Sequence, residues 1–119
     1  IDQPPSEIRY VNIKLPPTVY DYYEYESGLR STLLQIRFSL PMGDFETLEK
    51  RLPCRLGVVE TGYPEYGTVG TNDHGWFKPE DAKKHRGCDY RPGELLDASF
   101  LADISDNSRA IVYVVIGLE

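Results

Sequence analysis

The sequence predicts an α+β fold: an antiparallel sheet of about four or five strands with two short helices, in a single domain. Residues 110–118 carry no charge and are rich in β-branched side chains, which is typical of a central strand covered on both faces. The turn-forming residues 106–109 join this segment to residues 98–105, which supply a hairpin partner. A chain of 119 residues, 40% of them hydrophobic, is long enough to build one core.

Three further segments predict strands. Residues 8–15 mix apolar and polar side chains, as an edge strand does, and residues 55–60 predict a short strand. Residues 31–40 alternate strictly. Their apolar side comprises Leu34, Ile36, Phe38 and Leu40, and their other side comprises Leu33, Gln35, Arg37 and Ser39. We therefore expect a linker or N-terminal tail at residues 1–7 and one α+β domain at residues 8–119.

Two short helices are predicted, each followed by a cysteine. The first begins at Asp44, a residue suited to an N-cap, and ends before Pro53. The second spans residues 79–86, with acidic residues at its start, basic residues at its end and Gly87 as its C-terminal stop. The apolar face of the first helix comprises Phe45, Leu48 and Leu52.

Residues 18–27 combine four tyrosines with three carboxylates. Regular alternation places Tyr20, Tyr22, Glu24 and Glu26 on one face, and Asp21, Tyr23 and Tyr25 on the other. One interpretation is an amphipathic strand whose tyrosines pack while its acids stay hydrated. The other is an exposed acidic and aromatic surface for a basic partner, because tyrosine is enriched at interfaces.

Residues 61–75 predict a second part of this surface. They contain four glycines and form a loop that is long for a small domain, which favours a functional role or disorder. The candidate binding residues of both segments are Tyr20, Tyr22, Tyr23, Glu24, Tyr25, Tyr63 and Tyr66.

The two cysteines, Cys54 and Cys88, show no metal-binding spacing and predict a disulfide that closes a loop of about 35 residues. The alternative is two unrelated buried thiols in a reducing compartment. The chain begins at Ile1 with a polar segment, so either a leader was removed or the chain was trimmed. We expect an exported protein in the periplasm or cell envelope, with a possible lipid anchor upstream.

Composition excludes some classes of partner. The net charge of −6 argues against a nucleic-acid partner, which requires a basic surface. No apolar run approaches the length of about 20 residues that a transmembrane helix needs.

No catalytic or cofactor motif is present, and we expect no cofactor. A zinc site of His74, His85 and Cys88, with Cys54, and a cysteine nucleophile paired with a histidine base are both conceivable. A disulfide would rule out both sites. A small hydrolase or metal-dependent enzyme would instead use Asp73, His74 and His85. Otherwise we expect both histidines to be solvated residues of a loop or a helix end.

The order of features resembles a group of small, poorly characterised bacterial exported proteins, many of them predicted lipoproteins. An alternating strand ends in Phe38-Ser39-Leu40-Pro41, Trp76-Phe77-Lys78-Pro79 opens the second helix, and residues 106–113 open the last strand. The resemblance implies an exported α+β domain and no catalytic residues. The chain lacks the N-terminal cysteine that accepts a lipid in such proteins.

These observations favour a non-catalytic exported protein that binds or inhibits another protein, such as an immunity protein that blocks a toxin. The alternatives are the enzyme described above and an accessory structural domain of an envelope protein. The binding hypothesis predicts that alanine at Tyr22, Tyr23, Tyr63 or Tyr66 weakens the partner complex while the fold survives.

Overall fold

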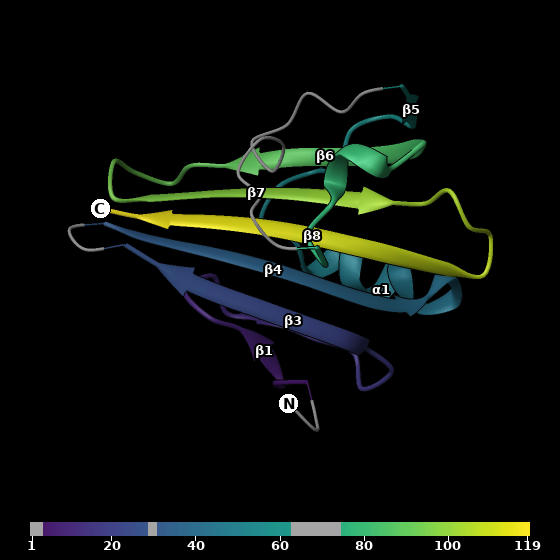
Figure 1. The fold of residues 1–119 in the computed structure, drawn as a ribbon, viewed down its shortest axis with the longest axis horizontal. Helices are drawn as coiled ribbons and strands as arrows, with labels where there is room; N and C mark the ends of the chain where they lie inside the picture. The colour runs from purple at the N-terminus through teal and green to yellow at the C-terminus, as the bar shows by residue number, and fades with distance from the viewer. Residues whose placement is uncertain (1–3, 29–30, 63–74) are drawn as a thin grey trace.

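Two long antiparallel strands, β4 (Thr32–Pro41) and β8 (Arg109–Leu118), form the centre of the fold (Figure 1). The computed structural model describes residues 4–28, 31–62 and 75–119. Ten consecutive residue pairs align β4 with β8, from Thr32 opposite Leu118 to Pro41 opposite Arg109. Buried side chains lie on both faces of β8, which confirms that residues 110–118 form a central strand covered on each side.

The main sheet has six antiparallel strands in the order β3-β4-β8-β7-β6-β5, with β3 and β5 at its edges (Figure 1). The hairpin partner predicted at residues 98–105 is β7. The remaining strands are β3 (Tyr20–Ser27), β5 (Glu60–Thr61), β6 (Lys84–Tyr90) and β7 (Leu96–Asp103). The α+β class is therefore confirmed, with more strands than the sequence predicts.

The prediction of one continuous strand at residues 8–15 is wrong. The segment instead folds into a hairpin of two short strands, β1 (Glu7–Ile8) and β2 (Ile13–Lys14), which form a separate two-stranded sheet. Tyr10 and Asn12 turn the chain between them, with φ angles of 71° and 54°. This left-handed backbone ends any continuous strand. The hairpin buries Ile8 and Ile13 in the main core.

The helix α1 (Met42–Arg51) begins two residues before the predicted start. Its N-cap position is occupied by Pro41, and no side chain caps its first turn. Asp44 lies inside the first turn, where its negative charge favours the helix dipole, and it accepts a hydrogen bond of 2.7 Å from the Thr18 hydroxyl. Phe45 and Leu48 bury the apolar side of α1 against the sheet.

The prediction of a second helix at residues 79–86 is also wrong. Only Pro79–Asp81 is helical, as one 3₁₀ turn, and β6 begins three residues later at Lys84. Pairing along β7 explains the difference, because it places Gly87 and Cys88 in the buried sheet opposite Leu101 and Phe100. Such tertiary burial outweighs a charge pattern that contributes only a few tenths of a kcal/mol to about 1 kcal/mol per group.

The strand predicted at residues 55–60 reduces to Glu60–Thr61, which pairs with β6. The residues before it follow β6 without forming a regular ladder: the Gly57 amide donates to the Gly87 carbonyl at 3.0 Å. Leu56 is buried, whereas Val58 is 78% exposed.

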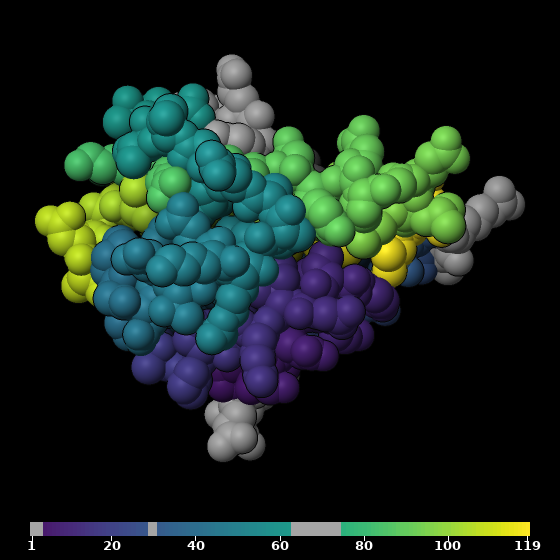
Figure 2. All heavy atoms as spheres, turned by 180° about the vertical axis from the view of Figure 1, so that it is seen from behind, coloured from purple at the N-terminus to yellow at the C-terminus, as the bar shows by residue number. Residues whose placement is uncertain are grey.

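The sheet buries a different cluster on each of its faces. We call the face covered by α1 and the N-terminal hairpin the helix face; the hairpin, α1 and the segment after it cover this side of the molecule in Figure 2. On the opposite face, Phe77 and Ala82 pack on β7 and β8. Phe77 is fully buried, as its size predicts, and Trp76 is partly buried beside it. The buried residues of this second cluster are Phe77, Ala82, Leu101, Tyr113 and Val115.

Cys54 and Cys88 form the predicted disulfide, with an S–S distance of 2.01 Å and a Cα–Cα distance of 6.0 Å. The bond joins the segment after α1 to β6. Beside it, the Arg86 guanidinium donates two hydrogen bonds, at 3.2 and 3.0 Å, to the Glu49 carboxylate of α1. Disulfides persist in oxidising compartments. Within the described residues, no helix is both long and apolar enough to span a bilayer.

Reduction of the disulfide should lower the free energy of unfolding by about 3–4 kcal/mol, because the 34-residue separation leaves the reduced unfolded chain far less restricted. Urea denaturation with and without a reducing agent measures this difference. The double substitution of Cys54 and Cys88 by serine is the control, since its stability should not respond to the reducing agent. Equal stability of the oxidised and reduced wild-type protein would contradict a structural role for the bond.

Candidate functional site

The tyrosines of β3 do not alternate as they would in a regular strand. Tyr20 lies opposite Ser39 and Tyr23 lies opposite Arg37, so β3 advances three residues while β4 advances two. The extra residue forms a β-bulge at Asp21, which has a left-handed φ angle of 51°. A bulge shifts the side-chain alternation by one residue, which brings Tyr20 to the same face as Tyr23 and Tyr25.

These three residues, which we call the tyrosine strip, lie on the face of the sheet opposite α1. The register places Tyr20, Tyr23 and Tyr25 beside Ser39, Arg37 and Gln35 of β4. Their exposed fractions are 38%, 42% and 46%, respectively. Because β3 is an edge strand, the strip lies along the border of the sheet (Figure 1). Three aligned, half-exposed tyrosines are a composition typical of protein interfaces.

The strand ends where the backbone demands glycine. Gly28 has a φ angle of 123°, and a Cβ atom at this position would lie 1.7 Å from the Ser31 carbonyl oxygen. Only glycine fits this position, so the end of β3 and the length of the strip are set by the sequence.

Two of the predicted binding residues, Tyr22 and Glu24, point away from the strip. Tyr22 is 8% exposed and stacks on Phe38 in the core, with 6.2 Å between the ring centroids. Burial raises the pKa of the Tyr22 hydroxyl well above its usual value, and the Glu24 carboxylate raises it further. Tyr22 is therefore a core residue, and its predicted alignment with Tyr20 is wrong because of the bulge.

The two glutamates of β3, Glu24 and Glu26, pair with a cation on the helix-face side. The Arg9 guanidinium pairs with the Glu24 carboxylate and lies 3.4 Å from Glu26. The Tyr10 hydroxyl also donates to Glu26 at 3.0 Å. The predicted acidic and aromatic surface therefore does not form one patch. Its glutamates bind the N-terminal hairpin on the helix face, and its exposed tyrosines lie on the opposite face of the sheet.

Other aromatic rings extend the strip towards the middle of the sheet. Trp76 stacks on Tyr23 with 5.6 Å between ring centroids, and Phe77 meets Trp76 edge to face at 5.8 Å. Tyr113 of β8 then meets Phe77 edge to face at 5.3 Å. The Arg37 guanidinium lies over Tyr23, 5.7 Å from the ring centroid. Sequence reasoning missed Arg37, although the alternation of residues 31–40 places it correctly on this face.

Of the three residues of the proposed enzyme site, the structure describes only His85. Tyr63, Tyr66, Asp73 and His74 lie outside the described residues. His85 is 2% exposed on β6, with Nε2 3.2 Å from the Gly62 carbonyl oxygen, so the expectation of a solvated loop or helix-end residue is wrong.

Cys54 and Cys88 are bonded to each other, so neither thiol can serve as a nucleophile or a zinc ligand. Among the residues that the structure describes, no group of three metal-ligating side chains is clustered.

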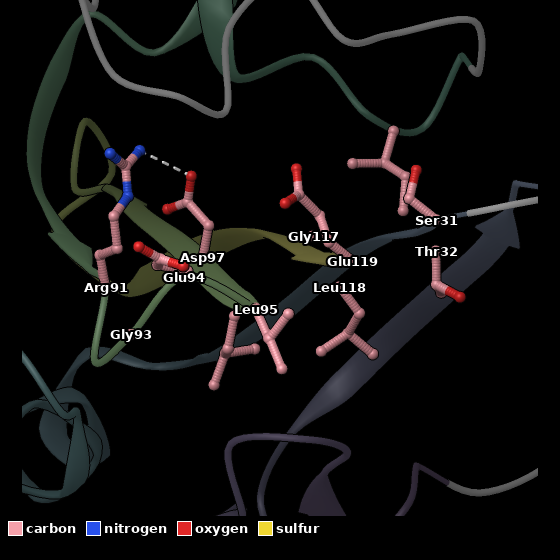
Figure 3. Close-up of a pocket in the computed structure, with 12 residues that line it drawn as sticks. Ser31, Thr32, Arg91, Gly93, Glu94, Leu95, Asp97, Gly117, Leu118 and Glu119 are labelled. Atoms are coloured by element: carbon pink, nitrogen blue, oxygen red, sulfur yellow. Dashed lines mark hydrogen bonds and ion pairs between the residues drawn. The ribbon is translucent and has the colours of Figure 1, made fainter.

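A surface hollow of about 510 Å³ lies at the end of the sheet, between the start of β4, the end of β8 and the loop that joins β6 to β7 (Figure 3). The Arg91 guanidinium donates to the Asp97 carboxylate at 2.8 Å across this loop. Glu94 and Leu95 are exposed, and Leu95 is 67% accessible. The acidic side chains of Glu94 and Asp97 that line the hollow are therefore exposed.

Comparison with protein families, curated proteins and solved structures finds no match.

The different burial of Tyr22 and Tyr23 predicts different effects for these two neighbouring tyrosines. Tyr22→Ala should lower the free energy of unfolding by about 3–5 kcal/mol, because it leaves a cavity beside Phe38. Tyr23→Ala should cost only about 1 kcal/mol, because it removes ring contacts from an exposed position. Urea denaturation of the two variants measures the contrast. Equal losses, or a larger loss for Tyr23→Ala, would mean that β3 has a different register.

Proposed function

We propose that this chain is a non-catalytic protein-binding module of the immunity or inhibitory type, which contacts its partner through the tyrosine strip. The observation that carries the proposal is the alignment of Tyr20, Tyr23 and Tyr25 on one exposed face of an edge strand. A tyrosine ring buries a large area with little loss of side-chain entropy, and its hydroxyl forms hydrogen bonds at the rim of an interface.

Rigidity supports the same role. Tyr23 stacks on the Trp76 ring and lies beside the Arg37 guanidinium of β4. These contacts restrict the Tyr23 ring, which reduces the entropy that association costs. Interfaces built on strands are also positioned more exactly than interfaces on loops.

The proposed location is outside the cytoplasm. The Cys54–Cys88 disulfide supports it, since such bonds are rare in reducing compartments. The net charge of −6 would attract a partner of positive overall charge and accelerate the encounter. The local contacts of the strip would then decide which partner is retained.

Capture from an envelope extract of the source cell tests this role. The immobilised wild-type protein should retain a partner that the double variant Tyr23→Ser with Tyr25→Ser retains at least about tenfold less, because truncated interface tyrosines are frequent hot spots. Quantitative mass spectrometry measures the retained proteins. An immunity-type role also predicts that the purified partner loses its own activity at a one-to-one ratio.

The matched control is the double variant Val58→Ser with Val59→Ser, which removes exposed apolar side chains near the opposite edge of the sheet. It should capture the partner as the wild-type protein does. The proposal fails if all three proteins retain the same set, or if the partner is lost only from the valine variant.

A further inference from the structure

The centre of the face that carries the tyrosine strip holds an arginine framed by aromatic rings. The register places Arg37 between Tyr23 of β3 and Tyr113 of β8. Its guanidinium lies 5.7 Å from the centroid of the Tyr23 ring. Burial raises the pKa of the Tyr113 hydroxyl, the positive charge of Arg37 opposes this rise, and the carboxylates of Asp103 and Asp81 add to it. Aromatic faces hold a guanidinium by cation–π attraction without neutralising its charge.

Arg37 differs from several other arginines of the protein. Arg9, Arg86, Arg91 and Arg109 each lie within 4.0 Å of a carboxylate oxygen. Arg37 has no such carboxylate among the described residues, although the chain carries 19 acidic residues. The glutamates of the neighbouring strand β3 point to the helix-face side and pair with Arg9. The Arg37 guanidinium is therefore not paired with a carboxylate among the described residues, although Asp103 and Asp81 are close enough to Tyr113 to raise the pKa of its hydroxyl.

Two buried polar atoms of β4 on this face lack a hydrogen-bond partner among the described residues. The Nε atom of Arg37 is buried and meets no hydrogen-bond acceptor within the described part of the chain. The hydroxyl of Ser39, two residues along the same face, is likewise buried without a partner there. A buried donor that lacks an acceptor destabilises the folded protein, and an acceptor supplied by a ligand removes that cost.

We infer that the guanidinium of Arg37, beside the tyrosine strip, binds an aspartate or glutamate carboxylate of the partner protein. This inference rests on the proposed function and adds the chemistry of the contact. The Nε and Nη groups of a guanidinium form a planar fork that matches the two oxygens of a carboxylate. The Tyr23 ring beside the guanidinium is 42% exposed on an edge strand, so Arg37 lies close to the surface that a partner would cover.

The positive overall charge proposed for the partner and this local carboxylate are compatible. Long-range charge sets the rate of encounter, whereas a single buried charge pair sets the register and the dissociation rate. A carboxylate at Arg37 would also discriminate between partners, because a partner without it would leave the guanidinium covered and unpaired.

A small probe tests the inference without the partner. The blocked peptide acetyl-Gly-Glu-Gly-amide should shift the Arg37 Nε–H resonance in a ¹⁵N spectrum, saturably and with a dissociation constant on the order of millimolar. Trp76, the single tryptophan, stacks on Tyr23, so its fluorescence should change over the same concentration range. The neutral peptide acetyl-Gly-Gln-Gly-amide, at equal ionic strength, should produce neither change.

Arg37→Gln should weaken the response to the glutamate peptide at least tenfold, whereas Arg91→Gln, at the far end of the sheet, should leave it unchanged. If Arg37→Gln does not fold, Arg37→Lys replaces it and should also weaken the response, because a lysine lacks the planar fork. Equal responses to both peptides, or an unchanged response in the Arg37 variant, overturn the inference. Binding of inorganic phosphate without binding of the glutamate peptide also overturns it, in favour of a small-anion site.

Failure of this inference is distinguishable from failure of the proposed function. If the glutamate peptide does not bind but the Tyr23 and Tyr25 double variant still loses its partner, the strip remains the interface and Arg37 is only structural. If the peptide binds at Arg37 and the strip variant retains every partner, the carboxylate site stands and the protein-binding role of the strip fails.

Discussion

The ten-residue register between β4 and β8 is the constraint on which the rest of the structure depends. A slip of β4 by one residue against β8 would exchange the two faces of β4, moving Leu34 and Phe38 out of the main core and Arg37 into it. Such a slip would expose buried apolar side chains to water, and this loss of hydrophobic stabilisation disfavours any other register. Because each strand side chain belongs to one face, the same pairing also decides that Arg37 and Tyr113 lie side by side on the face opposite α1.

The conformation of the edge strand β3 is a second constraint on the structure. The alternation of β3 buries Tyr22 on one face and presents Tyr23 and Tyr25 on the other, and the bulge at Asp21 brings Tyr20 to the face of Tyr23 and Tyr25. The same alternation separates the glutamates from the exposed tyrosines. The glutamates fasten the N-terminal hairpin through Arg9, which leaves the tyrosine strip beside a cation instead of beside acids.

Much of the sheet can be predicted from the sequence because its signal is local. Residues 31–40 and 110–118 have a strong apolar pattern, and long-range pairing agrees with it. The failures occur where tertiary pairing overrides local preference. Residues 79–86 carry the charges of a helix, but residues 84–86 begin the strand β6, which pairs with β7. The hairpin at residues 8–15 depends on left-handed residues that periodicity does not reveal.

The candidate site likewise combines features that the sequence reveals with features that only tertiary pairing sets. Its residue types are visible in the sequence, since four closely spaced tyrosines are unusual, and the pairing of Cys54 with Cys88 follows from simple counting. Which tyrosines share a face is not visible, because a single bulge residue reverses the alternation and no residue type specifies its position. The association of Trp76 with Tyr23 is a contact between distant segments, which only the folded chain brings together.

Tyrosine-selective acetylation of the folded protein, mapped residue by residue with mass spectrometry, tests the central claim most directly. The claim is that the bulge brings Tyr20 to the exposed face of Tyr23 and Tyr25, opposite the buried Tyr22. Tyr20, Tyr23 and Tyr25 should be acetylated readily, while Tyr22 reacts only after denaturation. Protection of Tyr20 together with Tyr22 would show that β3 alternates regularly, and the strip of three tyrosines would not exist.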